Sequence, residues 1–356
     1  MTRGIGMTEE RMGFGIVGCG VIGPWHRDAI NEVDGARLVA CCDIDEEKGR
    51  LFARESGGVT FYSDYHELAR DPEVEAVCVC TPSGLHGEVA IAAAEEGKHV
   101  LCEKPIEITA EKIDEMIDAC KSNGVKLANV FQRRTHEASR MAKRAIEDNL
   151  LGKMVLGDIY LKYYRSQSYY DSAGWRGTWR LDGGGALMNQ GVHGIDLALW
   201  IMGDVATVYG RTAHLLRDIE VEDTAIALLE YENGAWGVLE GTTSVNPGET
   251  TKLSLHGHKG TIVLEGEKIA KWAYTEAEDE KAEEQDIEVR SEKDGAASDP
   301  KAIGAQGHVF LVQDLVNSVR EDRDPFITGD SARKAVDLIL ALYESSRVGK
   351  PVDLEH

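Results

Sequence analysis

The glycine pattern near the start of the chain constrains its fold more than any other feature. Residues 18–23 read GCGVIG, begin at the end of the apolar run Phe14–Cys19 and open a predicted helix. In this context Gly18 permits a tight turn, Gly20 lets the backbone approach a pyrophosphate, and Gly23 permits close packing of the helix on the strand. The pattern therefore predicts a dinucleotide-binding turn. The residues predicted to contact the cofactor here are Gly18, Gly20, Val21, Ile22 and Gly23.

A carboxylate at the end of the next apolar run indicates which dinucleotide binds. Asp43 directly follows Arg37–Cys42 and lies twenty residues after Gly23. A carboxylate at this place accepts hydrogen bonds from the adenosine ribose and repels a 2′-phosphate. Ile44 and Asp45 follow it, so no arginine is at hand to bind that phosphate. NAD is therefore predicted in preference to NADP.

The first 132 residues alternate short apolar strands with helices, which is typical of a parallel sheet covered on both faces. We predict a doubly wound α/β domain of the Rossmann type over residues 1–132. The predicted strands are Phe14–Cys19, Arg37–Cys42, Ala76–Cys80, His99–Cys102 and Lys126–Phe131, and the predicted helices are Ile22–Asn31, Glu46–Glu55, Glu88–Glu96 and Ala110–Ser122.

Residues 133–353 follow a different pattern, in which strands succeed one another without intervening helices. This order predicts an α+β domain with a mostly antiparallel sheet. Its C-terminal helix is a candidate to pack back on the first domain. The predicted strands are Met154–Tyr164, Ala206–Ala213, Thr224–Tyr231, Ala235–Ser244, Lys252–His256 and Thr261–Leu264, and the helices are Glu137–Asn149, Ala186–Met202, Gln306–Arg320 and Ser331–Val348.

Three segments stand outside this pattern. Glu276–Asp294 holds ten acidic and three basic residues and is interpreted as a surface loop or a solvated edge hairpin, with a partner-binding segment as the alternative. Residues 354–356 resemble the start of an expression tag. The native start is open among Met1, Met7 and Met12.

Charge and cysteine content limit the partners. The 39 basic and 62 acidic residues give a net charge of −23, which argues against nucleic acid and against an anionic membrane surface. No apolar run approaches the roughly 18 residues needed to span a bilayer. The seven cysteines show no C-x-x-C spacing and mostly lie in apolar runs, so they are predicted to be buried thiols in a reducing, cytoplasmic setting.

Two motifs end predicted parallel strands and so lie at the edge where ligands bind in such sheets. Thr81-Pro82 follows Ala76–Cys80, and Glu103-Lys104-Pro105 follows His99–Cys102. A lysine at this edge can donate a hydrogen bond to a substrate hydroxyl. The alternative is a surface Lys104 paired with Glu103.

The segment Gly183–Asp196 carries the second chemical signal. Asn189, His193, Asp196 and Trp200 share one stripe of the predicted helix, beside an apolar stripe. An imidazole between core and cleft can exchange a proton near neutral pH. The alternative is a core histidine satisfied by Asp196 or Asn189. No second histidine or cysteine has ligand spacing here, so no metal is predicted.

Four ordered motifs together resemble the Gfo/Idh/MocA oxidoreductases. They are the glycine turn, T-P-x-x-x-H at Thr81–His86, the E-K-P at Glu103–Pro105, and G-G-G-x-x-x-N/D-x-G-x-H-x-x-D at Gly183–Asp196. The resemblance covers nearly the whole chain. It implies a Rossmann domain, a second domain with an open sheet, and a homodimer or homotetramer assembled through that sheet.

The resemblance also implies roles for individual residues. Lys104 matches the lysine that hydrogen-bonds the reacting hydroxyl, and His193 matches the general acid/base or hydroxyl-orienting histidine. Asp196 matches a carboxylate that helps to hold the site. His86 and Glu103 match positions that line the nicotinamide half of the cofactor, with Thr81 and Pro82 beside them.

The chain departs from the family pattern at two positions. Many members have Asp where this chain has Asn189, which orients a hydroxyl but takes no proton, so that burden moves to His193 and Lys104. Ser83 replaces the asparagine of T-P-N. The run Gly183–Asp196 also resembles the branch that acts on nucleotide-linked amino-sugar uronates.

We therefore expect an NAD-dependent oxidoreductase of a sugar, sugar acid or cyclitol, with Tyr164, Trp175, Arg176, Asn189 and His193 at the substrate. Two other hypotheses stay open: a relative that uses NAD transiently to cleave a glycosidic bond, and a non-catalytic NAD-binding regulator. The wider set of candidate wall residues, each also open to a role in the sheet or an interface, is Tyr163, Tyr164, Arg165, Tyr169, Tyr170, Trp175, Arg176 and Arg180.

Overall fold

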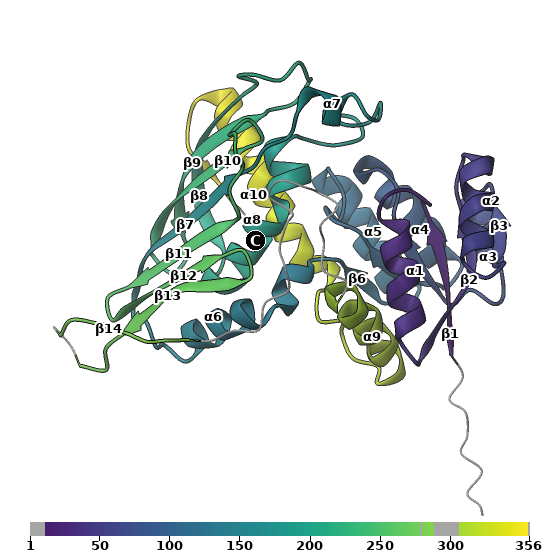
Figure 1. The fold of residues 1–356 in the computed structure, drawn as a ribbon, viewed down its shortest axis with the longest axis horizontal. Coiled ribbons are helices and arrows are strands. Elements are labelled where there is room, and N and C mark those ends of the chain that lie inside the picture. The colour runs from purple at the N-terminus through teal and green to yellow at the C-terminus, as the bar shows by residue number, and fades with distance from the viewer. Residues whose placement is uncertain (1–10, 278–279, 288–305, 355–356) are drawn as a thin grey trace, which may run out of the picture.

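The computed structural model describes residues 11–277, 280–287 and 306–354. Two sheets dominate it, one in each half of the chain, with helices between them (Figure 1). The predicted fold class is confirmed, because the first sheet is parallel and the second is mostly antiparallel.

The first sheet has the strand order β3-β2-β1-β4-β5-β6. Its strands are parallel in every pair, and β1 and β4 lie side by side at the centre, which is the doubly wound order. The strands are β1 Met12–Val17, β2 Ala36–Cys42, β3 Thr60–Tyr62, β4 Ala76–Val79, β5 His99–Cys102 and β6 Leu127–Asn129.

The helices of this half begin and end close to the predicted bounds. Asp45 caps α2 and Thr109 caps α5, each by accepting a backbone N–H of the first turn. Strand β3 and helix α3 were not predicted, because both are short, with three and six residues. The helices are α1 Gly23–Glu32, α2 Glu46–Glu55, α3 Tyr65–Arg70, α4 His86–Glu95 and α5 Ala110–Ser122.

The second sheet has the order β14-β13-β12-β11-β7-β10-β9-β8-β15. Among the described strand pairs of this second sheet, only β7–β10 is parallel, and the others are antiparallel. The strands are β7 Met154–Lys162, β8 Val205–Ala213, β9 Thr224–Tyr231, β10 Trp236–Thr242, β11 Lys252–Gly257, β12 Gly260–Glu265, β13 Lys268–Tyr274, β14 Glu283–Glu284 and β15 Val352–Asp353.

Helices cover the face of this sheet that is turned toward the first domain (Figure 1). Helix α8 packs on β7 and β11, and α10 packs on β8, with α6 beside α8. Helix α9 contacts α1, and α10 contacts α5 and β6, so the end of the chain joins both halves. The helices are α6 Glu137–Glu147, α7 Gln167–Tyr170, α8 Val192–Met202, α9 Gln306–Arg320 and α10 Gly329–Val348.

The single helix predicted over Ala186–Met202 is wrong in its first part. Ala186–Gly191 forms a π-helical segment, η3, and the α-helix α8 begins only at Val192. The buried Glu222 carboxylate accepts the backbone N–H groups of Gly185 and Leu187 and so fixes the start of η3. A π turn holds an extra residue per turn, so side chains before and after it do not keep the α-helical stripe.

Other predictions fall partly outside the described residues. Met1, Met7, His356 and much of the acidic segment lie there, whereas Met12 begins β1. Of that segment, Glu283–Glu284 pairs with β13 at the sheet edge. All seven cysteines are buried and free. No helix among the described residues is long and apolar enough to cross a membrane.

Candidate active site

The glycine turn has the geometry of a phosphate cradle. Gly18 has φ 101°, and a Cβ there would clash with the carbonyl oxygen of Cys80. A Cβ on Gly20 would meet no protein atom within 4 Å, so this glycine borders space open to a ligand. No side chain caps the N-terminus of α1, and its N–H groups can therefore face an anion. These observations fit the pyrophosphate of a dinucleotide.

Asp43 lies buried at the end of β2, beside this turn. Its carboxylate accepts the backbone N–H of Cys19 at 2.9 Å and that of Asp45 at 2.9 Å. Lys48 also places its Nζ 2.7 Å from Asp43 Oδ2. These contacts fix the carboxylate beside the glycine turn, and its contact with the ribose stays a prediction.

His86 braces the two strand ends that carry the sequence motifs. Its Nδ1 lies 2.8 Å from the carbonyl oxygen of Pro105, and its Nε2 lies 2.9 Å from that of Thr81. The ring is buried, and both nitrogens are engaged by the backbone. His86 therefore joins the ends of β4 and β5, and a contact with nicotinamide stays a prediction for His86, Thr81 and Pro82.

Lys104 reaches from the end of β5 into the second domain. Its Nζ donates to the carbonyl oxygen of Asn189 at 2.8 Å. Burial lowers the pKa of Lys104, while the carboxylates of Glu103 and Asp182 oppose that shift. The predicted alternative, an exposed lysine paired with Glu103, does not describe this side chain.

Asp182 is a site residue that the motifs did not single out. Its carboxylate is buried and accepts the side-chain N–H of Asn189 and the backbone N–H of Gly177, the latter at 2.8 Å. Burial raises the pKa of Asp182 to about 6. The sequence signal that could have identified Asp182 is its place directly before Gly183-Gly184-Gly185, the start of the motif that also contains Asn189.

His193 lies at the start of α8, near Lys104 and against Phe131. The two rings of His193 and Phe131 meet edge to face with centroids 5.9 Å apart. Burial, followed by the charges of Lys104 and Arg133, holds the pKa of His193 well below its usual range. Its Nδ1 is buried and has no hydrogen-bond partner among the described residues. A neutral imidazole is thus available as a proton acceptor.

Asp196 and Trp200 turn away from this group. Asp196 is buried and forms a two-pronged ion pair with Arg134, at 2.5 and 2.8 Å. The Trp200 ring packs near the same guanidinium and meets Phe326 edge to face. The Asp196–Arg134 pair joins α8 to the segment after β6. Asp196 therefore stabilises the position of α8, which carries His193, through a contact outside the group of Lys104, Asn189 and His193.

An arginine and aromatic cluster lies next to Asn189. Gln190 donates to the Tyr169 hydroxyl at 2.8 Å and accepts from Arg165 Nε at 2.9 Å. The Arg176 guanidinium lies over the Tyr169 ring at 4.2 Å and over the Trp175 ring at 4.7 Å. Tyr169, Trp175, Arg165 and Arg176 thus form one wall.

Tyr163 and Tyr170 border that cluster, because the Arg165 guanidinium lies near the Tyr163 ring and the Tyr170 ring meets the Tyr169 ring edge to face. Tyr163 and Tyr170 direct their hydroxyls to Thr251 and Thr243 inside the fold. Tyr164 stacks with Arg217. These contacts place Tyr163 and Tyr170 in the packing of the second domain, whereas Arg180 stays a prediction.

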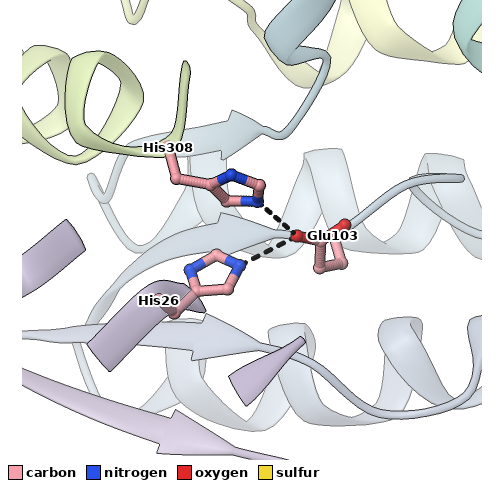
Figure 2. Close-up of side chains that lie close together, drawn as sticks. All are labelled: His26, Glu103 and His308. Atoms are coloured by element: carbon pink, nitrogen blue, oxygen red, sulfur yellow. Dashed lines mark hydrogen bonds and ion pairs between the residues drawn. The ribbon is translucent and has the colours of Figure 1, made fainter. Parts of the chain in front are cut away.

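Glu103 directs one carboxylate oxygen toward two buried histidines, and its predicted contact with the nicotinamide half of the cofactor stays a prediction. Its Oε1 lies 2.9 Å from His26 Nε2 and 3.3 Å from His308 Nε2, as Figure 2 shows. Its Oε2 accepts the backbone N–H of Lys104 at 3.2 Å. The sequence motifs did not point to His26 or His308, which come from α1 and α9.

A doubly wound domain with this glycine turn, and a lysine and histidine meeting beside its strand ends, defines a dinucleotide-dependent oxidoreductase. Residues 12–131 match the family model described as an oxidoreductase family with an NAD-binding Rossmann fold, and residues 139–263 match the Gfo/Idh/MocA C-terminal domain. The chain belongs to the Gfo/Idh/MocA family, and the resemblance drawn from the motifs is confirmed. It is an enzyme of the NAD-binding oxidoreductase class.

Several relatives of known activity are similar to this chain. A myo-inositol 2-dehydrogenase of Thermotoga maritima is 31% identical over 70% of this chain and 74% of its own. A scyllo-inositol 2-dehydrogenase (NAD⁺) of Bacillus subtilis is 25% identical over 98% and 97%. The crystal structure of the WlbA dehydrogenase of Bordetella pertussis with NADH and UDP-GlcNAcA has a TM-score of 0.86 and 33% identity, over 98% and 100% of the two chains.

Proposed function

We propose that the protein transfers a hydride between NAD(H) and a secondary alcohol of a sugar, sugar acid or cyclitol. The observation that carries the proposal is the meeting of Lys104, Asn189 and His193 beside the carboxyl ends of β5 and β6. The inositol dehydrogenases and the WlbA structure support the substrate class.

The cofactor, when bound on the glycine turn and Asp43, supplies the hydride acceptor or donor. The chain's own residues then position the alcohol and move its proton. The Lys104 ammonium donates a hydrogen bond to the substrate oxygen, because burial and its Asn189 contact fix its place. His193, held neutral, accepts the hydroxyl proton in oxidation and returns it in reduction.

Asn189 is the orienting member of the group. Its side-chain N–H is donated to Asp182, so its side-chain oxygen faces the opposite way, and that oxygen accepts from Gln190 at 2.5 Å. An amide fixed at both ends keeps one orientation. Asn189 therefore holds geometry and takes no proton, in agreement with the expected shift of that burden to His193 and Lys104.

A nucleotide-linked amino-sugar uronate is the second candidate substrate. The WlbA structure with UDP-GlcNAcA is 33% identical over nearly the full length of both chains. Arg176 offers a matching group, because its Nε is buried and has no partner among the described residues. A guanidinium at the cleft wall is suited to a sugar carboxylate.

A substrate panel read by NADH absorbance tests both candidates. It contains myo-inositol, scyllo-inositol, neutral hexoses, free uronates and UDP-GlcNAcA, each with NAD and with NADP. Oxidation of one class with NAD, lost in His193→Ala, is the expected result. Glycoside cleavage without net NADH would favour transient use of NAD. Binding of NAD with no turnover across the panel would favour the regulatory role.

We also propose that the chain forms a homodimer or homotetramer through the second sheet. No described helix covers the face of this sheet opposite α8 and α10 (Figure 1). It exposes large apolar side chains on adjacent strands, namely Tyr209, Ile226, Leu228 and Trp236. An apolar patch of this kind marks a protein interface. The buried free thiols accord with a cytoplasmic location.

A further inference from the structure

Three side chains from distant parts of the chain meet below the site. His26 of α1, Glu103 at the end of β5 and His308 of α9 are all buried, with exposed fractions of 0%, 6% and 2% (Figure 2). The two rings lie edge to face with centroids 5.2 Å apart, and both Nε2 atoms point at Glu103 Oε1. The cluster has no role in the mechanism given above.

The hydrogen-bond pattern assigns the tautomers. Glu103 Oε1 is the acceptor for both rings, so each Nε2 carries the hydrogen. The Nδ1 atoms of His26 and His308 then have bare lone pairs, and neither has a partner among the described residues. Two histidines that each donate one Nε2–H to the same carboxylate satisfy the buried charge and leave only weak acceptors unpaired.

A divalent metal ion is the competing interpretation of the same atoms. The three ligand atoms lie within 4.8 Å of one another, which suits coordination. A ligating Nε2, however, puts the hydrogen on Nδ1, and metal-bound histidines almost always donate that N–H to a carboxylate or carbonyl. Neither Nδ1 has such an acceptor in the part of the chain that is described. The geometry therefore favours a hydrogen-bonded anion.

We propose that His26 and His308 are positioning residues that hold Glu103 as a buried anion, and that this anion fixes the place and the charge of Lys104. The link is direct, since Glu103 Oε2 accepts the backbone N–H of Lys104. The carboxylate has three N–H donors, which offsets the cost of its burial. Helices α1 and α9 thereby reach the reacting lysine through one side chain.

The charges around Lys104 set the sign of the effect. Glu103 and Asp182 favour its ammonium form, whereas burial, Arg176 and Arg165 oppose it, and the nearby His193 is held neutral. Hydrogen bonds from His26 and His308 outweigh burial and hold the pKa of Glu103 well below its usual range. Removing the negative charge from Glu103 must therefore lower the pKa of Lys104.

The test measures the charge of Lys104 without a substrate. Purified full-length protein is labelled briefly with acetic anhydride across a pH series, and the fraction acetylated at Lys104 is read by peptide mass spectrometry. In Glu103→Gln the midpoint should fall by about one pH unit, the size expected for loss of one nearby opposite charge. Lys334, whose side chain is 42% exposed and paired with Asp204, is the internal control.

The histidines are tested by paired variants. His308→Ala should lower the Lys104 midpoint in the same direction by a smaller amount, and His308→Gln, which keeps a donor, should restore it. His256→Ala, on β11 and bonded to Thr261, should leave it unchanged. Thermal melting of each variant identifies those that are folded and can be compared.

Two outcomes would overturn the proposal. One is an unchanged Lys104 midpoint in folded Glu103→Gln. The other is one equivalent of tightly bound metal in the purified protein that is lost in both Glu103→Gln and His26→Gln. The consequence for turnover rests on the proposed role of Lys104, but the labelling does not. Failure of the substrate panel would contradict the proposed function, whereas an unchanged labelling midpoint would contradict the role of His26, Glu103 and His308, so the two failures can be told apart.

Discussion

The Nζ of Lys104 lies 2.8 Å from the carbonyl oxygen of Asn189, across 85 residues of sequence. Lys104 follows β5 of the first sheet by two residues, and Asn189 belongs to the π-helical segment that precedes α8. The contact thus joins the cofactor domain to the second domain at the point where chemistry is proposed. The reacting group exists only while the two domains stay packed together.

Replacing the lysine isolates its contribution to turnover. Lys104→Met keeps an unbranched side chain but removes the ammonium, so we expect kcat/KM to fall by about 10²–10⁴-fold. NAD affinity should stay within a few-fold, because the glycine turn and Asp43 are untouched. Lys121→Met, an exposed change on α5, is the control. Near-normal turnover in Lys104→Met would remove Lys104 from the mechanism.

Asp182 gives the site a dependence on pH. Its pKa of about 6 means that the carboxylate ionises as the pH rises through that value, and the anion then holds Asn189 and favours the Lys104 ammonium. We expect kcat/KM of the wild type to rise between about pH 5 and 7. Asp182→Asn should lose that rise and fall about 10-fold at pH 7.5. A retained step near pH 6 in the variant would assign it to another group.

Sequence patterns predicted the parts of the site that depend on local structure. The glycine turn, Asp43 and Lys104 lie at strand ends, and apolar strand runs are easily recognised, so their common edge follows from the fold class. His193 was found because its motif is contiguous. The π-helical segment was not predicted, because no residue type at positions 186–191 distinguishes it from the first turn of an α-helix.

Contacts between elements that are far apart in the chain could not be predicted from the sequence. His308 reaches Glu103 from 205 residues away, and its approach depends on how α9 packs on α1. Asp196 was interpreted as part of the site, but its carboxylate meets Arg134, whose position depends on the turn after β6. Such partners are set by tertiary packing, which one sequence without homologues does not show.

Asp43 should control the choice of cofactor. In the wild type, Lys48 Nζ lies 2.7 Å from the Asp43 carboxylate. Asp43→Asn removes the negative charge that repels a 2′-phosphate and leaves the Lys48 ammonium without a counter-charge. We expect NAD to bind about 10-fold more weakly and NADP more tightly, measured by fluorescence titration. Adding Lys48→Ala should abolish the gain for NADP. Unchanged selectivity in Asp43→Asn would exclude the ribose contact.

Glu222 makes stability depend on pH. Burial raises its pKa to about 7 in the folded chain, against 4.5 for an ordinary glutamate. The folded state therefore holds a proton that the unfolded chain has lost, and stability falls as pH rises from about 4.5 to 7. The loss reaches about 3 kcal/mol for this shift. Urea unfolding of Glu222→Gln should show a flatter slope over that range, and an unchanged slope would contradict the assignment.

The open face of the second sheet makes the last prediction, that a charge placed there separates the subunits. Leu228 is 59% exposed and lies directly opposite Tyr209 of β8 and Val238 of β10, so the three side chains form an apolar strip across adjacent strands. A glutamate in that strip would bury an unpaired charge in the interface, which costs several kcal/mol per subunit contact.

We therefore expect Leu228→Glu to lower the molar mass measured by light scattering toward that of a monomer, while the far-ultraviolet circular dichroism is retained. Leu51→Glu is the matched control, because Leu51 is 47% exposed on α2, away from the sheet. A wild-type protein that is already monomeric, or a Leu228→Glu variant that keeps the wild-type mass, would show that this face is not the interface. If Leu51→Glu dissociates the oligomer and Leu228→Glu does not, the interface would be assigned to the first domain.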